Sequence, residues 1–142
     1  MKICIVLANY YPHISKDLFL GTVRALKKNG VSKFKKISAP GVFEIPVIIA
    51  RNINKFDAFI ALGCVIKGKT PHFDFISKSS IDAIMKLSID YKKPIGNGII
   101  TCLNRKQALE RSDPNKKNKG GEAANAILAI IKNVAKWDIK KS

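Results

Sequence analysis

The sequence predicts an α/β fold in which a four-stranded parallel sheet carries helices on both faces. Apolar strand-like runs alternate with helical patterns along the whole chain, which is the order of a parallel sheet with helical crossovers. The runs at residues 3–7 and 58–62 are continuously apolar, as in strands buried on both faces. The 142 residues contain no repeat or linker, so we expect residues 1–142 to form a single domain.

Each expected element has a local signal in the sequence. Asn29-Gly30 is a helix stop, and Pro40-Gly41 turns the chain into a helix that contains Glu44. Gly96 and Gly98 mark a strand whose backbone must approach a neighbouring group closely. The last helix has apolar residues at helical spacing, namely Ala124, Ile127, Leu128, Ile131 and Val134. In chain order we expect a strand at 3–7, a helix from Ser15 to Asn29, a weaker strand at about 31–38, a helix at about 44–54, a strand at 58–66, a long helix after Pro71, a strand at 95–103, and helices at about 105–111 and 121–136.

The charge is unusual for a domain of this size. There are 26 Lys and Arg residues against 10 Asp and Glu residues, a net charge of +16. Such an excess suggests a nucleic-acid-binding domain. The lysines are nevertheless scattered along the chain and are not gathered on one recognition helix. A Lys-rich surface around a site for an anionic small molecule therefore explains the composition better.

Cysteine usage and hydropathy indicate the class of protein. The three cysteines, Cys4, Cys64 and Cys102, lie in apolar strand-like contexts without a C-x-x-C pair, so we expect reduced buried thiols, no disulfide and no metal. No apolar run approaches the ~20 residues of a membrane span. The short opening run at residues 3–8 is better explained as a strand than as a signal peptide. We therefore expect a cytoplasmic protein that does not bind membranes.

A histidine stands at the predicted start of the long helix. Thr70 is a good N-cap and Pro71 suits the first helical position, which places His72 second. Free N–H groups and the helix dipole make such a start an anion site, and Lys69 adds a cation. The dipole disfavours an imidazolium cation, so His72 is suited to accept a proton. A plain capped helix with a surface histidine is the alternative.

Three further segments combine chemistry with a strand end or a helix end. Tyr10 follows the first strand, where its ring could stack on a planar heterocycle or simply close the core. Glu44 could accept hydrogen bonds from hydroxyl groups or answer the dipole of its own helix. Arg111 ends one helix and Lys119 starts the next, so both could reach one phosphate, unless they form only a basic turn. Ligands of open α/β sheets bind at the carboxyl ends of the strands, where most of these residues fall.

Taken together, these residues carry a resemblance to lumazine synthases. The matching motifs occur in the family's order from the first strand to the last helix; they are Tyr10-Tyr11, Gly41-Val42-Phe43-Glu44-Ile45-Pro46, Leu62-Gly63-Cys64-Val65-Ile66-Lys67-Gly68, Thr70-Pro71-His72-Phe73-Asp74 and Asn118-Lys119-Gly120. The resemblance implies a flavodoxin-like three-layer sandwich and a condensation that uses no cofactor. In that reaction 5-amino-6-(D-ribitylamino)uracil and 3,4-dihydroxy-2-butanone 4-phosphate give 6,7-dimethyl-8-ribityllumazine, phosphate and water, the penultimate step of riboflavin biosynthesis. A non-catalytic flavin-binding module is a second alternative, but it would need a glycine-rich loop after the first strand, which Asn9-Tyr10-Tyr11-Pro12 does not provide.

The resemblance also implies a role for each site residue. His72, Arg111 and Lys119 are the expected catalytic residues, with His72 moving protons. Lys69, Thr70 and Arg111 are expected to bind the butanone phosphate. The residues expected to bind the ribitylaminouracil are Tyr10, Val42, Phe43, Glu44, Cys64, Val65, Ile66 and Asn97. The chain departs from the family at Tyr10, where Phe is usual, at Tyr11, where Asn is frequent, and at Asn97, where Phe is usual.

Assembly is the last expectation from the resemblance. It implies a homopentamer whose active sites are shared between neighbours, or a decamer if two rings stack, with riboflavin synthase as a candidate partner. Capsid-forming relatives carry a glycine-rich turn between the last two helices, whereas here residues 112–117 contain Pro114 and two lysines. The short N-terminus also lacks a segment that could join a neighbour's sheet. We therefore expect a ring of five and not a sixty-subunit shell.

Overall fold

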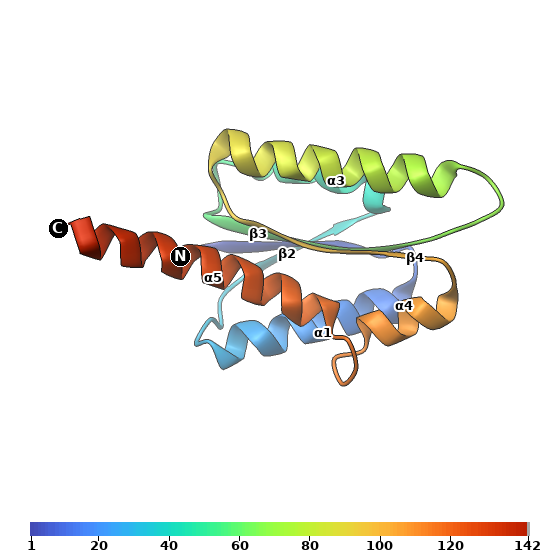
Figure 1. Cartoon of the computed structure of the whole chain (residues 1–142), viewed down its shortest axis with the longest axis horizontal. Coiled ribbons are helices and arrows are strands. Elements are labelled where there is room, and N and C mark those ends of the chain that lie inside the picture. Colours follow the sequence, from blue (N-terminus) through green and yellow to red (C-terminus); the bar gives the residue numbers. More distant parts are fainter. Residues whose placement is uncertain (142) are drawn as a thin grey trace.

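The computed structural model describes the backbone of residues 1–141 and the side chains of residues 1–133. The described chain forms three layers, with one sheet between two layers of helices (Figure 1). The four strands are parallel and lie in the order β2-β1-β3-β4. They are β1 (Ile3–Ala8), β2 (Lys35–Ala39), β3 (Ala58–Ile66) and β4 (Ile95–Cys102). The predicted α/β fold with a flavodoxin-like parallel sheet is confirmed.

Helices cover both faces of this sheet. In Figure 1, α3 lies above the sheet, and α1, α4 and α5 lie below it. The helical elements are α1 (Pro12–Lys28), the 3-10 turn η1 (Val42–Glu44), α2 (Ile45–Asn52), α3 (His72–Tyr91), α4 (Arg105–Ser112) and α5 (Lys119–Lys141). Among the described residues, no helix has both the length and the apolar character that a membrane crossing requires.

The core is divided in two by the sheet because successive strand residues point to opposite faces. On β1, Ile5 and Leu7 pack with the helices α1, α4 and α5, whereas Cys4 and Val6 belong to the cluster on the α2 and α3 side. All six residues of β1 are buried. This accounts for the continuous apolar pattern that predicted a parallel strand.

The bounds of the first elements differ from the prediction. Helix α1 begins at Pro12 and not after Ser15, because proline suits the first helical position and the buried Ser15 hydroxyl donates to the Ala8 carbonyl at 2.7 Å. Strand β2 begins only at Lys35, because Val31 N still donates to the Leu26 carbonyl and closes α1. The helix expected at 44–54 is a 3-10 turn followed by the shorter α2. As a result, residues 40–44 form a bend and a 3-10 turn between β2 and α2.

Helices α3 and α5 also begin differently. The prediction that Thr70 caps α3 is wrong: Pro71 is the N-cap, and His72 is the first helical residue instead of the second. The Thr70 hydroxyl only accepts a long hydrogen bond of 3.4 Å from His72 N. Helix α5 begins at Lys119, two residues earlier than expected, and within its predicted apolar stripe Val134 lies outside the residues whose side chains are described.

The two glycines of β4 explain how α5 is placed. A Cβ at Gly96 would collide with the carbonyl oxygen of Ala123, and a Cβ at Gly98 would collide with the Leu62 side chain. The predicted close approach at both glycines is therefore confirmed. As a result, the first turns of α5 lie directly against β4, and Lys119 lies beside the same strand.

Candidate active site

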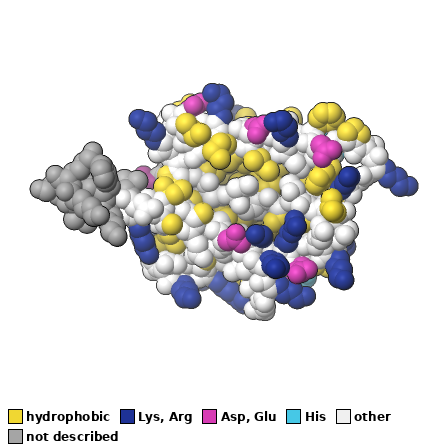
Figure 2. All heavy atoms as spheres, in the orientation of Figure 1, with side chains coloured by type: hydrophobic (Ala, Val, Ile, Leu, Met, Phe, Trp, Pro, Cys, Tyr) yellow, Lys and Arg dark blue, Asp and Glu magenta, His cyan; other side chains and the backbone are white. Residues whose placement is uncertain are grey.

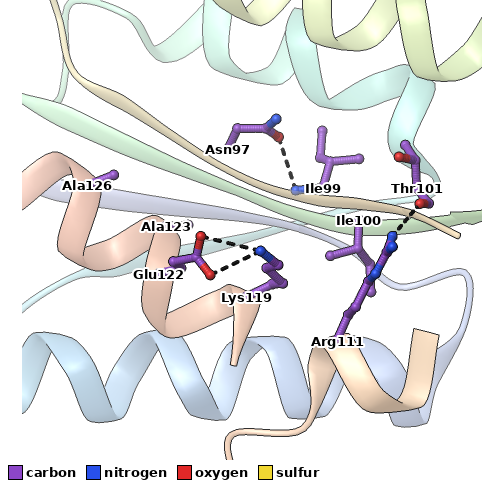
Figure 3. A pocket seen from close by; sticks show the side chains of 9 residues that line it. All are labelled: Asn97, Ile99, Ile100, Thr101, Arg111, Lys119, Glu122, Ala123 and Ala126. Atoms are coloured by element: carbon purple, nitrogen blue, oxygen red, sulfur yellow. Dashed lines mark hydrogen bonds and ion pairs between the residues drawn. The ribbon is translucent and has the colours of Figure 1, made fainter. Parts of the chain in front are cut away.

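The predicted site residues that line cavities are divided between two of them. The first, which we call the aromatic pocket, has a volume of about 520 Å³ and lies at the carboxyl ends of β1, β2 and β3. Its lining residues are Tyr10, Tyr11, Pro40, Gly41, Val42, Phe43, Glu44, Cys64, Val65, Ile66, His72 and Ile76. The second, the basic pocket, has a volume of about 390 Å³ and lies between β4, the end of α4 and the start of α5. Its lining residues are Asn97, Ile99, Ile100, Thr101, Arg111, Lys119, Glu122, Ala123 and Ala126 (Figure 3).

The pairing of β1 with β2 brings two segments of the aromatic pocket together. Ala8 pairs with Ala39, and Asn9 N donates to the Ala39 carbonyl at 3.2 Å. Residues 10–11 and 40–44 therefore leave the sheet side by side. The Tyr10 side chain is 70% exposed and meets Tyr11 edge-on, with 5.0 Å between ring centroids. A ring with this exposure has an open face on which a planar ligand can stack.

The segment after β2 gives the pocket an apolar wall and a carboxylate. Phe43 is exposed, whereas Val42 is buried. Val42 packs closely on Gly63: a Cβ on Gly63 would lie 2.7 Å from Val42 Cγ2. Glu44 N donates to the Gly41 carbonyl at 3.3 Å, and a Cβ on Gly41 would lie only 3.1 Å from Glu44 Oε1. The carboxylate thus folds back over its own turn beside an exposed ring, where ligand hydroxyl groups can donate to it.

Strand β3 and helix α3 complete the aromatic pocket. Cys64 is buried, while Val65 and Ile66 are partly buried. His72 lies exposed at the first turn of α3 and lines the pocket. Burial is the main cause that raises the pKa of the Tyr11 phenol above its ordinary value. The structure thus brings His72 and the residues at the end of β3 into one cavity with those that follow β1 and β2.

The basic pocket presents two cations from neighbouring helix ends. Arg111 reaches from α4 to β4, where its Nη1 donates to the Thr101 carbonyl at 2.8 Å (Figure 3). Lys119 Nζ lies 3.1 Å from Glu122 Oε2. The Asn118 side chain accepts from Gly121 N at 3.2 Å, which caps α5 and fixes Lys119 at its start. A guanidinium and an ammonium group around one cavity suit a phosphate.

The remaining predicted site residues, Asn97, Lys69 and Thr70, do not lie with the residues to which the prediction assigned them. Asn97 was expected beside the ring-binding residues, but it lies on β4 and lines the basic pocket. Its Oδ1 atom accepts from Ile99 N at 3.1 Å. Lys69 and Thr70 are exposed in the connection between β3 and α3, and neither lines one of the two cavities. Expected phosphate-binding residues thus lie at two separate places on the chain.

Some lining residues were not predicted from the sequence. Thr101 and Glu122 line the basic pocket, and Ile76 lines the aromatic pocket. The spacing of Glu122 three residues after Lys119 on a helix could have indicated their ion pair. A backbone carbonyl such as that of Thr101 leaves no signal in the sequence.

The three cysteines are buried in the sheet, as the apolar runs around them predicted. Cys4, Cys64 and Cys102 are all free and buried. Within residues 1–133, no three His, Cys, Asp or Glu side chains lie close enough together to share a metal ion. The lysines and arginines visible in Figure 2 are spread around the face instead of forming one patch.

Comparisons with known proteins lead to one enzyme family. A family model described as 6,7-dimethyl-8-ribityllumazine synthase matches residues 1–135. The 6,7-dimethyl-8-ribityllumazine synthase of Bartonella tribocorum is 44% identical over 132 residues, which cover 91% of this chain and 87% of the relative. The one from Novosphingobium aromaticivorans is 41% identical, with 96% of this chain and 98% of the relative covered. The one from Zymomonas mobilis is 42% identical, with 92% and 94% covered.

Proposed function

The chain belongs to the 6,7-dimethyl-8-ribityllumazine synthase family, and we propose that its two pockets bind the two substrates of that reaction. The enzyme condenses 5-amino-6-(D-ribitylamino)uracil with 3,4-dihydroxy-2-butanone 4-phosphate in riboflavin biosynthesis. The products are 6,7-dimethyl-8-ribityllumazine, phosphate and water. Neither a nucleic-acid-binding domain nor a non-catalytic flavin-binding module is supported by the relatives.

The aromatic pocket binds the ribitylaminouracil. Tyr10 stacks on the pyrimidine ring, for which its exposed face is available. Phe43 and Val42 form an apolar wall, and the Glu44 carboxylate accepts hydrogen bonds from ribityl hydroxyl groups. The end of β3 adds Cys64, Val65 and Ile66, mainly through the backbone.

The basic pocket binds the phosphate of the second substrate. Arg111 offers a planar fork of donors, and Lys119 offers a point charge. Glu122 holds Lys119 until the phosphate arrives, and Asn97 reaches the bound ring from the same side. Lys69 and Thr70 precede His72, which lines the aromatic pocket. In the assembled site they approach the phosphate from the protomer that supplies the aromatic pocket.

His72 moves the protons of the condensation. The substrate amine attacks the ketone, the resulting carbinolamine loses water to form a Schiff base, phosphate is eliminated, and the ring closes with loss of a second water. Formation of the Schiff base and closure of the ring transfer protons between nitrogen and oxygen atoms, and elimination of phosphate removes a proton from the carbon next to the imine. An exposed imidazole at the rim of the aromatic pocket can accept and return these protons. Most of the rate comes from holding the two substrates together, because positioning removes the entropic cost of their encounter. This chemistry needs no cofactor.

A complete site requires two copies of the chain. The two pockets share no lining residue, although the reaction joins their substrates covalently. We infer a closed ring of five protomers in which the aromatic pocket of one meets the basic pocket of the next, as heterologous contacts allow. Two such rings give a decamer. Pro114 in the turn between α4 and α5, with its neighbouring lysines, argues against a sixty-subunit shell.

Location and partners follow from the same chemistry. Three free, buried cysteines fit the reducing cytoplasm, where we place the enzyme. Riboflavin synthase consumes the lumazine product and is a candidate partner of the assembly.

The separation of the two pockets is the observation that carries this proposal, and direct assay tests it. The purified chain is mixed with both substrates, and lumazine absorbance and fluorescence are followed. We expect product only when both substrates and the protein are present. If no lumazine forms from active substrates, as judged by a characterised lumazine synthase run in parallel, the proposed function is wrong.

A further inference from the structure

A buried thiol lies beneath the arginine of the basic pocket. Cys102 is the last residue of β4 and is fully buried. Arg111 Nη1 donates to the Thr101 carbonyl at 2.8 Å and lies 4.0 Å from Cys102 Sγ. The guanidinium is therefore attached to the end of β4 along one edge, by one backbone atom and one side-chain atom.

A second thiol supports the first. In the β3–β4 register, Cys64 pairs with Ile100, and Ile66 pairs with Cys102. Cys64 and Cys102 are thus two positions apart on adjacent strands, so they point to the same face of the sheet. Both belong to the core cluster against α1, α4 and α5. Cys64 also lines the aromatic pocket, whereas Cys102 contacts Arg111 of the basic pocket.

The two thiols are not equivalent in charge. The neighbouring Cys64 thiol, and then the Arg111 guanidinium, lower the pKa of Cys102 to about 7 against the opposing effect of burial. The interaction with Cys102 and burial raise the pKa of Cys64 above its ordinary value. Cys4 is also fully buried, but it lies in the other core cluster, and desolvation raises its pKa to about 11. Burial alone therefore does not produce the acidic thiol, and the contacts around Cys102 do.

We propose that Cys102 is a positioning residue that holds the Arg111 guanidinium toward the basic pocket. This inference rests on the proposed role of Arg111 in binding the substrate phosphate. The Thr101 carbonyl would be present whatever residue followed it, whereas the sulfur is supplied only by the Cys102 side chain. With two acceptors on Nη1, the opposite edge of the guanidinium is free to make a bidentate contact with a phosphate. Without the Cys102 sulfur, only the Thr101 carbonyl holds the guanidinium, and the Arg111 side chain can rotate away from the pocket. Restoring its orientation then costs free energy when the phosphate binds.

The first test compares the steady-state kinetics of matched variants. Cys102→Ala should raise KM for 3,4-dihydroxy-2-butanone 4-phosphate about two- to ten-fold, as expected for one lost hydrogen-bonding partner. KM for the ribitylaminouracil should stay near the wild-type value. Cys102→Ser keeps an acceptor at the same position and should recover most of the loss. Cys4→Ala removes a buried thiol that has no arginine contact, so it should leave both KM values unchanged.

The second test is independent of catalysis. Ionisation of Cys102 is followed by the ultraviolet absorbance of the thiolate in a Cys4→Ala background. We expect a transition near pH 7 that Cys102→Ala removes and Arg111→Ala moves to higher pH, because the guanidinium stabilises the thiolate. An unchanged transition in Arg111→Ala would mean that the two side chains do not interact, and the proposal would be wrong.

The outcomes also distinguish this proposal from the proposed function. If Arg111→Ala raises KM for the phosphate substrate but Cys102→Ala behaves like Cys4→Ala, Arg111 binds phosphate without help from Cys102, and the positioning role is wrong. If Arg111→Ala itself leaves that KM unchanged, the phosphate-binding role of Arg111 is wrong, and the positioning role is overturned with it.

Discussion

The aromatic pocket and the basic pocket differ in how the chain builds them. The aromatic pocket is formed where the neighbouring strands β2, β1 and β3 end, so three connections meet at the carboxyl ends of these strands. The basic pocket is formed along the edge strand β4, by residues from the end of α4 and the start of α5. One pocket offers rings and a carboxylate, and the other offers cations. This difference is the basis of the proposal that a working site combines one pocket of each kind from neighbouring copies.

This difference predicts that substitutions in the two pockets have separate effects. Residues of the aromatic pocket should affect the ring substrate and the proton transfers. Residues of the basic pocket should affect the phosphate-bearing substrate. A residue that impaired both substrates equally would contradict the division.

The largest effect should come from His72→Ala. We expect turnover to fall about 100-fold, the lower end of the range for general acid–base assistance, because the positioned substrates still react. The measurement is kcat across a pH range around neutrality. His13→Ala is the matched control, because His13 is exposed and lines neither pocket. Its Nε2 atom lies 3.6 Å from Asp17 Oδ2. If His72→Ala keeps the wild-type kcat at every pH, His72 has no part in proton transfer.

Arg111→Ala should have the next largest effect. Loss of a charge-assisted contact costs about 1.5–3 kcal/mol, or roughly ten- to a hundred-fold in apparent affinity. We expect this change in KM for the butanone phosphate, with the ribitylaminouracil bound nearly as before. Arg51→Ala is a suitable control, because Arg51 lies exposed on α2 away from both pockets. Equal losses for both substrates in a variant that folds as the wild type does would contradict the division between the pockets.

Tyr10→Ala should have a smaller effect, and it should act on the ribitylaminouracil instead of the butanone phosphate. A stacking contact contributes about 0.5–1.5 kcal/mol, so KM for the ribitylaminouracil should rise about two- to ten-fold. Tyr10→Phe keeps the ring and should stay close to wild type. Tyr91→Ala, which removes another exposed tyrosine from the end of α3, should change neither KM. A rise in KM for the butanone phosphate in Tyr10→Ala would contradict the assignment of the aromatic pocket.

The aromatic pocket was largely predictable from the sequence. Continuous apolar runs indicated β1 and β3, and their parallel arrangement places the residues that follow them at one edge of the sheet. Tyr10 follows β1, Glu44 lies in the turn after β2, and Cys64 lies near the end of β3, so their convergence could be expected. The start of α3 was less predictable, because a Thr-Pro pair is compatible with either residue as the cap.

The basic pocket was predictable only in part. Arg111 and Lys119 were recognisable as the ends of adjacent helices, and that prediction is confirmed. The grouping of Asn97 with them depends on which strand occupies the edge of the sheet, which local sequence patterns do not specify. The contact between Arg111 and Cys102 depends on strand register and side-chain packing, so it required the structure.

Mixed oligomers test the central claim most directly. His72→Ala and Arg111→Ala chains are co-expressed in equal amounts, so that rings of both kinds of protomer form, and the activity is compared with that of each variant alone. The assay uses the butanone phosphate well below its KM, where both variants alone are expected to be nearly inactive. If each site takes the aromatic pocket from one copy and the basic pocket from its neighbour, about one site in four has both pockets intact, and about a quarter of wild-type activity should return. If each chain carries a complete site, the mixture will show no more than the average of the two variants, and the shared site will be contradicted.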